Sequence, residues 1–297
     1  MKKLIENAAI YLLCMIIISF SLFPITLAVL GSFMPETEHR SEATKPLWFK
    51  KGPTLAYYNF LFTGIWPTNP YERWTERALY TANIRYFPKV MLNSILVASG
   101  VMILTLICGT TGGYIFARIK FRGSMVLFLS ILASRLLPPV ALALPYYIVC
   151  SILGITSTLF SVILIHSAIA LPFVIWYLTL YYRTIPTEIE EASLIDGCTI
   201  FQTFYKISLR IAASGIAAIG LFSFLLSYNE LLFAQFLLEK IDVQTIPVFL
   251  AGLTHEPDIS WAMVYTLLTL IFIPSLILII VIWKYLRLSE LIGALKY

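Results

Sequence analysis

Six long runs of apolar residues constrain this chain more than any other feature. They lie near residues 8–30, 90–117, 124–151, 158–182, 211–235 and 261–283. About 20 apolar residues are needed to cross a bilayer as a helix, so each run is long enough to span one. The runs do not alternate between polar and apolar residues as the strands of a barrel would. Because backbone groups in lipid must pair within the protein, the sequence predicts an all-α membrane protein with six transmembrane helices.

The amino-acid composition agrees with this class. Hydrophobic residues make up 59% of the chain and charged residues 12%, whereas a soluble domain has roughly 25% charged residues. The first apolar run follows Lys2 and Lys3, as in a signal peptide. It is longer than the roughly 7–15 apolar residues of such a peptide, and no A-x-A cleavage site follows it. We therefore expect it to be retained as the first span.

The lysine and arginine residues indicate which way the spans run. They gather before the first span, between spans two and three, on either side of the segment 186–210, and after the last span. Short basic loops stay in the cytoplasm, so both termini are predicted to be cytoplasmic. The segment 31–89 has eight basic and five acidic residues. At about 60 residues it reaches the length where this rule fails, and we place it outside.

These features divide the chain into an N-terminal span (1–30), an extracytoplasmic segment (31–89), a membrane core (90–285) and a cytoplasmic tail (286–297). The core contains the short polar segment 186–210. The extracytoplasmic segment is rich in proline and aromatic residues. It is either a cap that contacts a partner outside the cell or a loop whose aromatic side chains anchor at the membrane surface.

The charge pattern and the histidines argue against two kinds of site. The net charge of +5 comes from scattered basic loops that form no stripe, so no nucleic-acid partner is expected; the surroundings are membrane lipid. The pair His255-Glu256 invites a metal site, but no HExxH pattern and no second nearby histidine accompany it. No metal site is predicted. No cysteine lies in a predicted outer loop, so no disulfide is expected there.

Two charged residues lie inside predicted spans, where a charge is costly and normally faces a cavity or another helix. Arg135 precedes Pro138-Pro139, a pair that removes two helical N–H donors and predicts a kink or break in the third span. Glu230 lies near the outer end of the fifth span. Each residue could line a transport pathway or have a structural role. In the structural alternative, Arg135 would snorkel or pair with Glu230, and Glu230 would face lipid headgroups. The candidate pathway or gate residues are Arg135, Pro138, Pro139, Tyr146, Asn229 and Glu230.

Small residues in the second span indicate close helix packing. Gly109 and Gly113 have the G-x-x-x-G spacing that lets two helix backbones approach each other. This pattern supports packing and indicates no specific chemistry.

The polar segment between spans four and five has the pattern of two helices around a glycine. Thr187 and Glu190 have capping-box spacing, which predicts the start of a helix. Gly197 can end it in a left-handed conformation. Thr199 and Gln202 have the same spacing, so a second helix is expected to run into span five. The apolar side chains of the segment are expected to form one face: Ile189, Ala192, Ile195, Phe201, Phe204 and Tyr205.

The residues of this segment resemble a known motif. Glu191-Ala192-Ser193, followed by Asp196-Gly197 and Ile207-Ser208-Leu209, resembles the EAA motif of binding-protein-dependent ABC importer permeases. The resemblance covers roughly residues 88–297 and implies a MetI-like permease core. Further patterns are similar to the carbohydrate, maltose-type branch: Asn93-Ser94, Arg118-Ile119-Lys120-Phe121-Arg122-Gly123, Leu137-Pro138-Pro139, Leu144-Pro145-Tyr146, Leu171-Pro172-Phe173, Arg183-Thr184-Ile185-Pro186, Tyr228-Asn229-Glu230 and Gln244-Thr245-Ile246-Pro247-Val248.

The resemblance implies a transport subunit of the cell's inner (cytoplasmic) membrane with no catalytic residues and no cofactor of its own. A second permease subunit would complete a sugar pathway. Two ATPase subunits would bind ATP and Mg²⁺, and an extracytoplasmic sugar-binding protein would deliver the sugar. ATP-driven closure of the ATPase pair would move the segment 186–210 and reorient the pathway.

The resemblance also implies roles for particular residues. The segment near 188–209 would lie in a cleft of an ATPase subunit, where Glu191 would pair with a basic residue, and the tail from Leu286 to Tyr297 would reach the same interface. The coupling residues would be Glu190, Glu191, Ala192, Ser193, Asp196 and Gly197. The loop near 251–258 would face the binding protein through Gly252, Thr254, His255, Glu256 and Asp258.

Two positions depart from the family pattern. Leu209-Arg210 stands where the family usually has Leu-Pro, so the junction into span five is expected to be less kinked. Ser193 replaces a commoner alanine, which is a mild change.

Two other classes of protein are compatible with six spans. A self-sufficient secondary transporter commonly has internal repeats and midplane ion sites, and this chain shows no convincing repeat. An intramembrane enzyme would need paired carboxylates, a metal cluster, or a nucleophile with its base. The only hint is His166 beside Ser167, and neighbours in sequence do not share a helix face. The sequence also lacks G-x-x-x-x-G-K-[ST], so it cannot hold nucleotide phosphates by that route.

Overall fold

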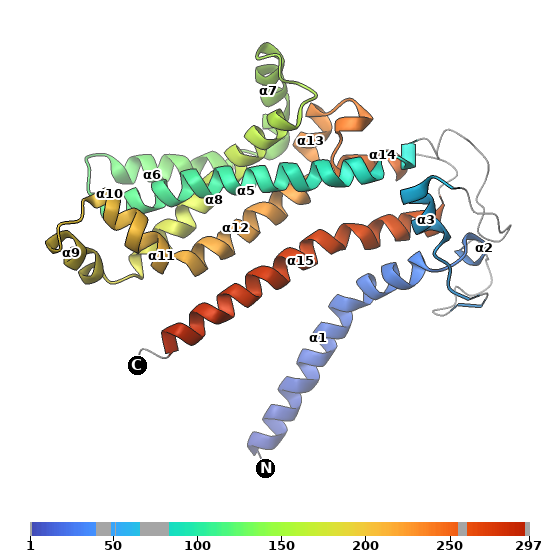
Figure 1. Cartoon of the computed structure of the whole chain (residues 1–297), viewed down its shortest axis with the longest axis horizontal. Coiled ribbons are helices and arrows are strands. Elements are labelled where there is room, and N and C mark those ends of the chain that lie inside the picture. The colour runs from blue at the N-terminus through green and yellow to red at the C-terminus, as the bar shows by residue number, and fades with distance from the viewer. Residues whose placement is uncertain (1, 40–48, 51, 66–82, 255–259, 295–297) are drawn as a thin grey trace. The chain divides into compact units, whose positions relative to one another are not determined.

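The computed structural model describes residues 2–39, 49–50, 52–65, 83–254 and 260–294. Within these ranges the chain is helical, with turns and irregular connections and no strand (Figure 1). It divides into two compact units: residues 1–88 with 252–274, and residues 89–251 with 275–297. Each unit is described by itself.

The first unit joins the segment that follows α1 to two apolar helices. It contains α1 (Lys2–Ser32), α2 (Glu36–His39), α3 (Ala56–Thr63) and the start of α15 (Trp261–Ala294). The buried Glu36 accepts hydrogen bonds from Ser260 Oγ at 2.7 Å and from the Ala262 backbone N–H at 3.1 Å. Its carboxylate therefore satisfies a free N–H in the first turn of α15, where the helix dipole also favours a negative charge.

The second unit is a bundle around α8. In chain order its helices are α5 (Phe87–Arg118), α6 (Ser124–Ala133), η1 (Ser134–Leu136), α7 (Pro139–Ile152), α8 (Leu159–Arg183), α9 (Thr187–Ile195), α10 (Ile200–Thr203), the π-turn η2 (Phe204–Ser208), α11 (Leu209–Ile211), α12 (Ala213–Tyr228), α13 (Leu232–Leu237), η3 (Ile241–Val243) and α14 (Ile246–Thr254). Both α6 and α12 pack along α8 (Figure 1).

The predicted spans appear as four continuous helices and two bent pairs. The continuous ones are Ile10–Ser32, Phe87–Arg118, Leu159–Arg183 and Trp261–Lys284. The predicted third span is Ser124–Leu136 with Pro139–Ile152, bent by 101°. The fifth was predicted at 211–235, whereas the bent pair found there is Ile200–Ile211 with Ala213–Tyr228, bent by 76°, so it begins and ends earlier than predicted. If each pair is one span, the described residues hold six. The break before Pro139 confirms the predicted effect of the proline pair, since proline cannot donate to the preceding turn.

The bend into α12 does not depend on proline. The helix breaks at Ala212, which lies two residues after Arg210 and is fully buried, and the two parts differ in direction by 76°. The junction is thus strongly bent even without a proline at position 210. The π-turn of Phe204–Ser208, directly before the bend, already departs from regular helical hydrogen bonding, and such turns are a recognised cause of kinks.

Glycines on α5 allow it to approach α8 closely, as predicted. A Cβ on Gly109 would collide with Val174. A Cβ on Gly113 would lie 2.7 Å from Leu178 Cβ and 3.1 Å from the α8 backbone. This contact leads into a buried cluster at the same end of the bundle: Tyr114, Val174, Leu178, Tyr182, Ile185, Phe204, Ala212 and Ile219.

Two sequence patterns about 150 residues apart meet at the start of α5. Asn93 Nδ2 donates to the backbone carbonyls of Asp242 at 3.0 Å and Gln244 at 3.1 Å. The Ser94 hydroxyl accepts from the Ile246 backbone N–H at 2.7 Å. These side chains satisfy backbone groups of a turn that has no regular ladder, which gives the Asn-Ser pair in the first part of α5 a structural role.

Replacing Gly113 by alanine is expected to destabilise the bundle by about 1–3 kcal/mol, because α8 backbone atoms cannot move aside as a side chain can. Gly112→Ala is the matched control. Its nearest neighbour, the Ile175 side-chain tip at 3.3 Å, is flexible, and alanine favours a helix. Thermal unfolding of the purified proteins in detergent would compare them, and equal midpoints would contradict this packing.

Candidate functional site

The segment between α8 and α12 forms two short helices around a left-handed glycine. The first helix, α9, ends at Ile195, and Gly197 follows with φ of 89°. The Gly197 N–H donates to the Leu194 carbonyl at 3.1 Å, and the Cys198 N–H donates to the Ser193 carbonyl at 3.0 Å. A positive φ costs glycine little, so the residue type fits the turn. The predicted order of helix, glycine turn and helix is confirmed.

One of the two predicted capping boxes is present. The Gln202 N–H donates to Thr199 Oγ1 at 3.3 Å, and the Thr199 N–H donates to Gln202 Oε1 at 2.9 Å. The prediction of a box from Thr187 to Glu190 was wrong. The helix is preceded by Pro186, which makes no side-chain cap, and Thr187 is already helical. The Glu190 side chain makes a buried set of contacts instead.

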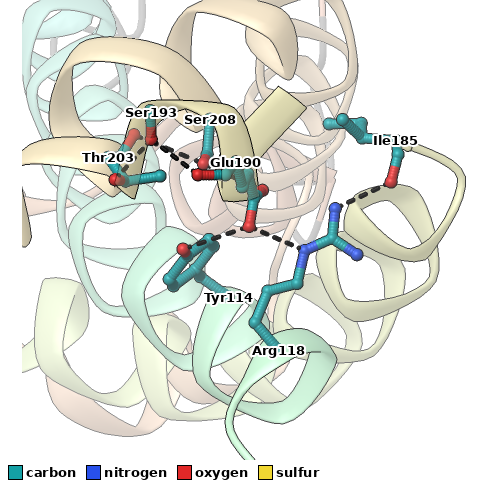
Figure 2. Close-up of polar contacts among 7 residues, drawn as sticks. All are labelled: Tyr114, Arg118, Ile185, Glu190, Ser193, Thr203 and Ser208. Carbon is teal, nitrogen blue, oxygen red and sulfur yellow. Dashed lines mark hydrogen bonds and ion pairs between the residues drawn. The ribbon is translucent and has the colours of Figure 1, made fainter. Parts of the chain in front are cut away.

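Glu190 is the centre of a polar network that joins this segment to α5 (Figure 2). Its Oε2 accepts from Arg118 Nε at 3.0 Å and from the Tyr114 hydroxyl at 3.3 Å. Its Oε1 accepts from the Ser208 hydroxyl at 3.0 Å. The Arg118 guanidinium also donates to the Ile185 carbonyl at 2.8 Å. The Arg118 and Glu190 side chains are only 11% and 9% exposed, so the ion pair is largely shielded from water.

Ser193 adds a second connection inside the segment. Its hydroxyl donates to the Glu190 carbonyl at 2.7 Å and lies 2.7 Å from Thr203 Oγ1 (Figure 2). It therefore links α9 to α10 at a buried position. Sequence reasoning treated serine here as a mild change from alanine. The Thr203 partner lies ten residues on, and nothing in the sequence indicated that the two hydroxyls would meet.

The remaining predicted residues of the segment face outward. Glu191, Ala192, Asp196 and Gly197 are exposed. Of the predicted apolar face, only Phe204 is buried, whereas Ile195, Phe201 and Tyr205 are 87%, 74% and 65% exposed. Beside Phe201 lies an apolar cavity of about 330 Å³, lined by Thr111, Tyr114, Ile115, Ile119, Ile200, Phe201 and Phe204. The segment is thus held on one side by the polar contacts of Glu190, and its other side is an exposed apolar surface.

A second candidate site lies at the break of the third span. Arg135 is in η1, between α6 and α7, and donates to the Ile169 carbonyl of α8 at 3.0 Å. It lines a cavity of about 170 Å³ together with Ser134, Leu137, Pro139, Leu142, Tyr146, Ala168, Ile169 and Phe233. Three predicted pathway residues, Arg135, Pro139 and Tyr146, are therefore brought together. Pro138 immediately precedes α7.

Glu230 pairs with His166, and the suggested pairing with Arg135 was wrong. Its Oε2 lies 2.8 Å from His166 Nε2, and the carboxylate also accepts from the backbone N–H groups of Phe233 and Ala234 at the start of α13. His166 Nδ1 lies 2.8 Å from Ser227 Oγ. Neighbouring Asn229 ends α12 and donates to the Leu225 carbonyl at 2.8 Å. These contacts shape the turn between α12 and α13.

The Ser227, His166 and Glu230 cluster contains the residue types of a hydrolase, but its histidine is fully buried. A general base must come within hydrogen-bond reach of its substrate. Both ring nitrogens already lie beside protein oxygens, so the arrangement is structural. Sequence reasoning considered His166 only beside Ser167, whereas its partners are 61 and 64 residues away along the chain.

The proposed binding-protein loop is only partly described. Gly252 and Thr254 belong to the end of α14. His255, Glu256 and Asp258 lie outside the described residues. Within the described ranges, no group of three or more His, Cys, Asp or Glu side chains could hold a metal ion.

Comparison with protein families matches residues 109–289 to the family described as "Binding-protein-dependent transport system inner membrane component". The chain belongs to this family. With its several long apolar helices, this permease is a multi-pass inner membrane protein and a component of an ABC transport system.

Relatives of the permease agree with this assignment. It is 30% identical over 198 residues to the inner membrane ABC transporter permease protein YcjP of Escherichia coli, which covers 66% of this chain and 71% of YcjP. It is 28% identical over 212 residues to the trehalose/maltose transport system permease protein MalG of Thermococcus litoralis, 71% and 76% of the two chains. It is 32% identical over 160 residues to the diacetylchitobiose uptake system permease protein NgcG of Streptomyces coelicolor, 54% and 50% of the two chains.

A solved structure shares the fold of the permease. A chain from the crystal structure of a bacterial ABC transporter involved in the import of the acidic polysaccharide alginate superposes with a TM-score of 0.72. The match covers 95% of this chain and 96% of that chain, with 18% sequence identity. The MetI-like permease fold predicted from the motifs is thereby confirmed.

Removing the Glu190 carboxylate is expected to destabilise the segment that contains it. In Glu190→Ala the Arg118 guanidinium stays buried without its partner, and breaking such a pair costs about 3–5 kcal/mol. Glu191→Ala removes an exposed neighbouring charge and should cost about 0.5 kcal/mol or less. Thermal unfolding and protease cleavage within residues 187–211 would measure both. Equal effects of the two substitutions would contradict the network.

Proposed function

We propose that this permease is one half of the translocation pathway of an ATP-driven, binding-protein-dependent sugar importer. Relatives named for trehalose/maltose and diacetylchitobiose transport support a sugar as the cargo. A second permease subunit would supply the other half of the pathway, and an extracytoplasmic binding protein would deliver the sugar. ATP and Mg²⁺ would be bound by two ATPase subunits, since the chain has no phosphate-binding loop of its own.

The observation that carries this proposal is the contrast between the two sides of the segment 187–211. One side is fixed to α5 because Glu190 accepts from Arg118 and Tyr114. The other presents Ile195, Phe201 and Tyr205 without cover. Exposed apolar patches with a polar rim mark interaction sites. Both termini and this segment are assigned to the cytoplasm from the basic residues around them, where an ATPase subunit would be the partner.

Such a coupling element requires a rigid connection to the spans. If the segment moved freely, displacement by an ATPase subunit would bend the connection and leave the spans in place. The Glu190 ion pair joins the segment to α5, and the Ser193–Thr203 contact joins its two helices to each other. Movement of the segment would therefore be transmitted to α5 and, through η2 and α11, to α12. Glu191 and Asp196 stay available for basic side chains of the ATPase.

Substitutions on the exposed side should weaken ATPase binding and leave the fold intact. In the complex reconstituted with its ATPase subunits, Phe201→Ser removes an apolar contact and Glu191→Ala removes a charged one. Each is expected to weaken association by about tenfold or more, as loss of a well-packed interface side chain does. Co-purification and ATP-dependent uptake would measure this, with membrane insertion unchanged.

The matched control is Lys120→Ala, an exposed change in the loop between α5 and α6, which should retain both activities. The proposal would be abandoned if Phe201→Ser and Glu191→Ala both kept full ATPase binding and uptake, or if the purified chain alone hydrolysed ATP.

A further inference from the structure

The cavity at the break of the third span has a positively charged lining that coupling to an ATPase does not explain. Among the residues that line it, Arg135 is the only one charged at neutral pH. Within the described part of the chain, no carboxylate forms an ion pair with its guanidinium. The sequence suggested Glu230 as a partner of Arg135, but the Glu230 carboxylate lies beside His166 instead.

The position of Arg135 inside an apolar candidate span makes this unusual. Arg135 lies eleven residues after Ser124, where α6 begins next to a basic loop. At 1.5 Å per residue this is about 16 Å, roughly half of a hydrocarbon core of about 30 Å. A charged side chain at this depth is costly unless it faces a partner or a water-filled cavity. A lipid phosphate stays at the membrane surface, so a lipid headgroup is not the partner.

The guanidinium is positioned for a further partner. Its Nη1 donates to the carbonyl of Ile169 on α8, and this hydrogen bond fixes the orientation of the Arg135 side chain. A guanidinium carries five N–H donors in a planar fork, and a carboxylate matches that fork with two parallel hydrogen bonds. The 14-residue helix α7 also begins at the cavity, at Pro139, and no side chain caps its N-terminus. The partial positive charge of that helix end adds to the charge of Arg135.

The remaining lining suits one unit of a saccharide. Tyr146 and Phe233 pack with ring centroids 5.7 Å apart and both border the cavity. Aromatic rings of this kind offer flat apolar surfaces. The volume of about 170 Å³ is below the roughly 300–1,000 Å³ of pockets that enclose a whole small ligand. The cavity would thus hold a single sugar unit of a longer cargo.

We propose that Arg135 is a specificity-determining residue that selects a saccharide bearing a carboxylate, such as a uronic acid unit, as it passes this cavity. This rests on the proposed function and names the substrate class of the same pathway. Hydroxyl groups of a neutral sugar could be bound by neutral side chains, which would spare the cost of placing a cation at this depth. An anionic cargo offsets that cost by pairing with the guanidinium.

The test uses the full complex of permease subunits, ATPase subunits and binding protein in proteoliposomes. Two probes are compared: a trisaccharide of glucuronate units and its carboxyl-reduced counterpart, which is neutral and has the same ring size. For each probe, uptake by the variant is divided by uptake by the unsubstituted complex. This ratio cancels the selectivity of the binding protein, which both complexes share.

The Arg135→Gln complex is expected to import the acidic probe about 10- to 100-fold less, the range of a lost charge-assisted hydrogen bond, and to change little with the neutral probe. Arg135→Lys keeps the charge but not the planar fork, so its uptake of the acidic probe should lie between that of Arg135→Gln and that of the unsubstituted complex. The control Arg122→Gln removes one exposed basic residue from the loop between α5 and α6 and should not discriminate between the probes.

Two results would overturn the inference. Equal losses for both probes would show that Arg135 has a structural role, such as pairing with a carboxylate of the second permease subunit. Import of the neutral probe but not the acidic one by the unsubstituted complex would show that the pathway does not select a carboxylate. Neither result affects the proposed coupling function, which is judged by ATPase association of the Phe201 and Glu191 variants.

Discussion

The need to pair every backbone polar group inside lipid governs this structure. Four apolar stretches meet it as continuous helices. The interrupted ones are supported by side chains at each break. The Glu230 carboxylate accepts the free N–H groups that begin α13, and Arg135 donates to a carbonyl of α8 next to the break before α7. Arg135 and Glu230 therefore both lie where the helices are broken.

The same principle explains the buried acid at the other end of the bundle. Burying a carboxylate is costly unless hydrogen bonds and an opposite charge compensate. Glu190 has all of these: a guanidinium and two hydroxyls. Such a pair adds little net stability compared with apolar packing, but it fixes one geometry. In a segment proposed to receive a movement and pass it on, a single fixed geometry is the more useful property.

The close approach of α5 to α8 makes this geometry possible. Gly113 brings the two backbones together one residue before Tyr114 and five before Arg118. Both side chains then reach Glu190 from the final turns of α5. A larger residue at Gly113 would push the end of α5 away from α8 and from the carboxylate. The packing of α5 against α8 therefore determines the electrostatics of the segment 187–211.

The sequence by itself determined the membrane class, the four continuous apolar helices, the break at Pro138-Pro139, the glycine turn at Gly197 and the Thr199–Gln202 cap. Each depends on local residue type and spacing, which a single segment carries. Only the tertiary structure decided which of the adjacent acids, Glu190 or Glu191, is buried, and that His166 rather than Arg135 holds Glu230. Those outcomes depend on side chains from distant helices, and the spacing within one segment contains no information about which helix will lie beside it.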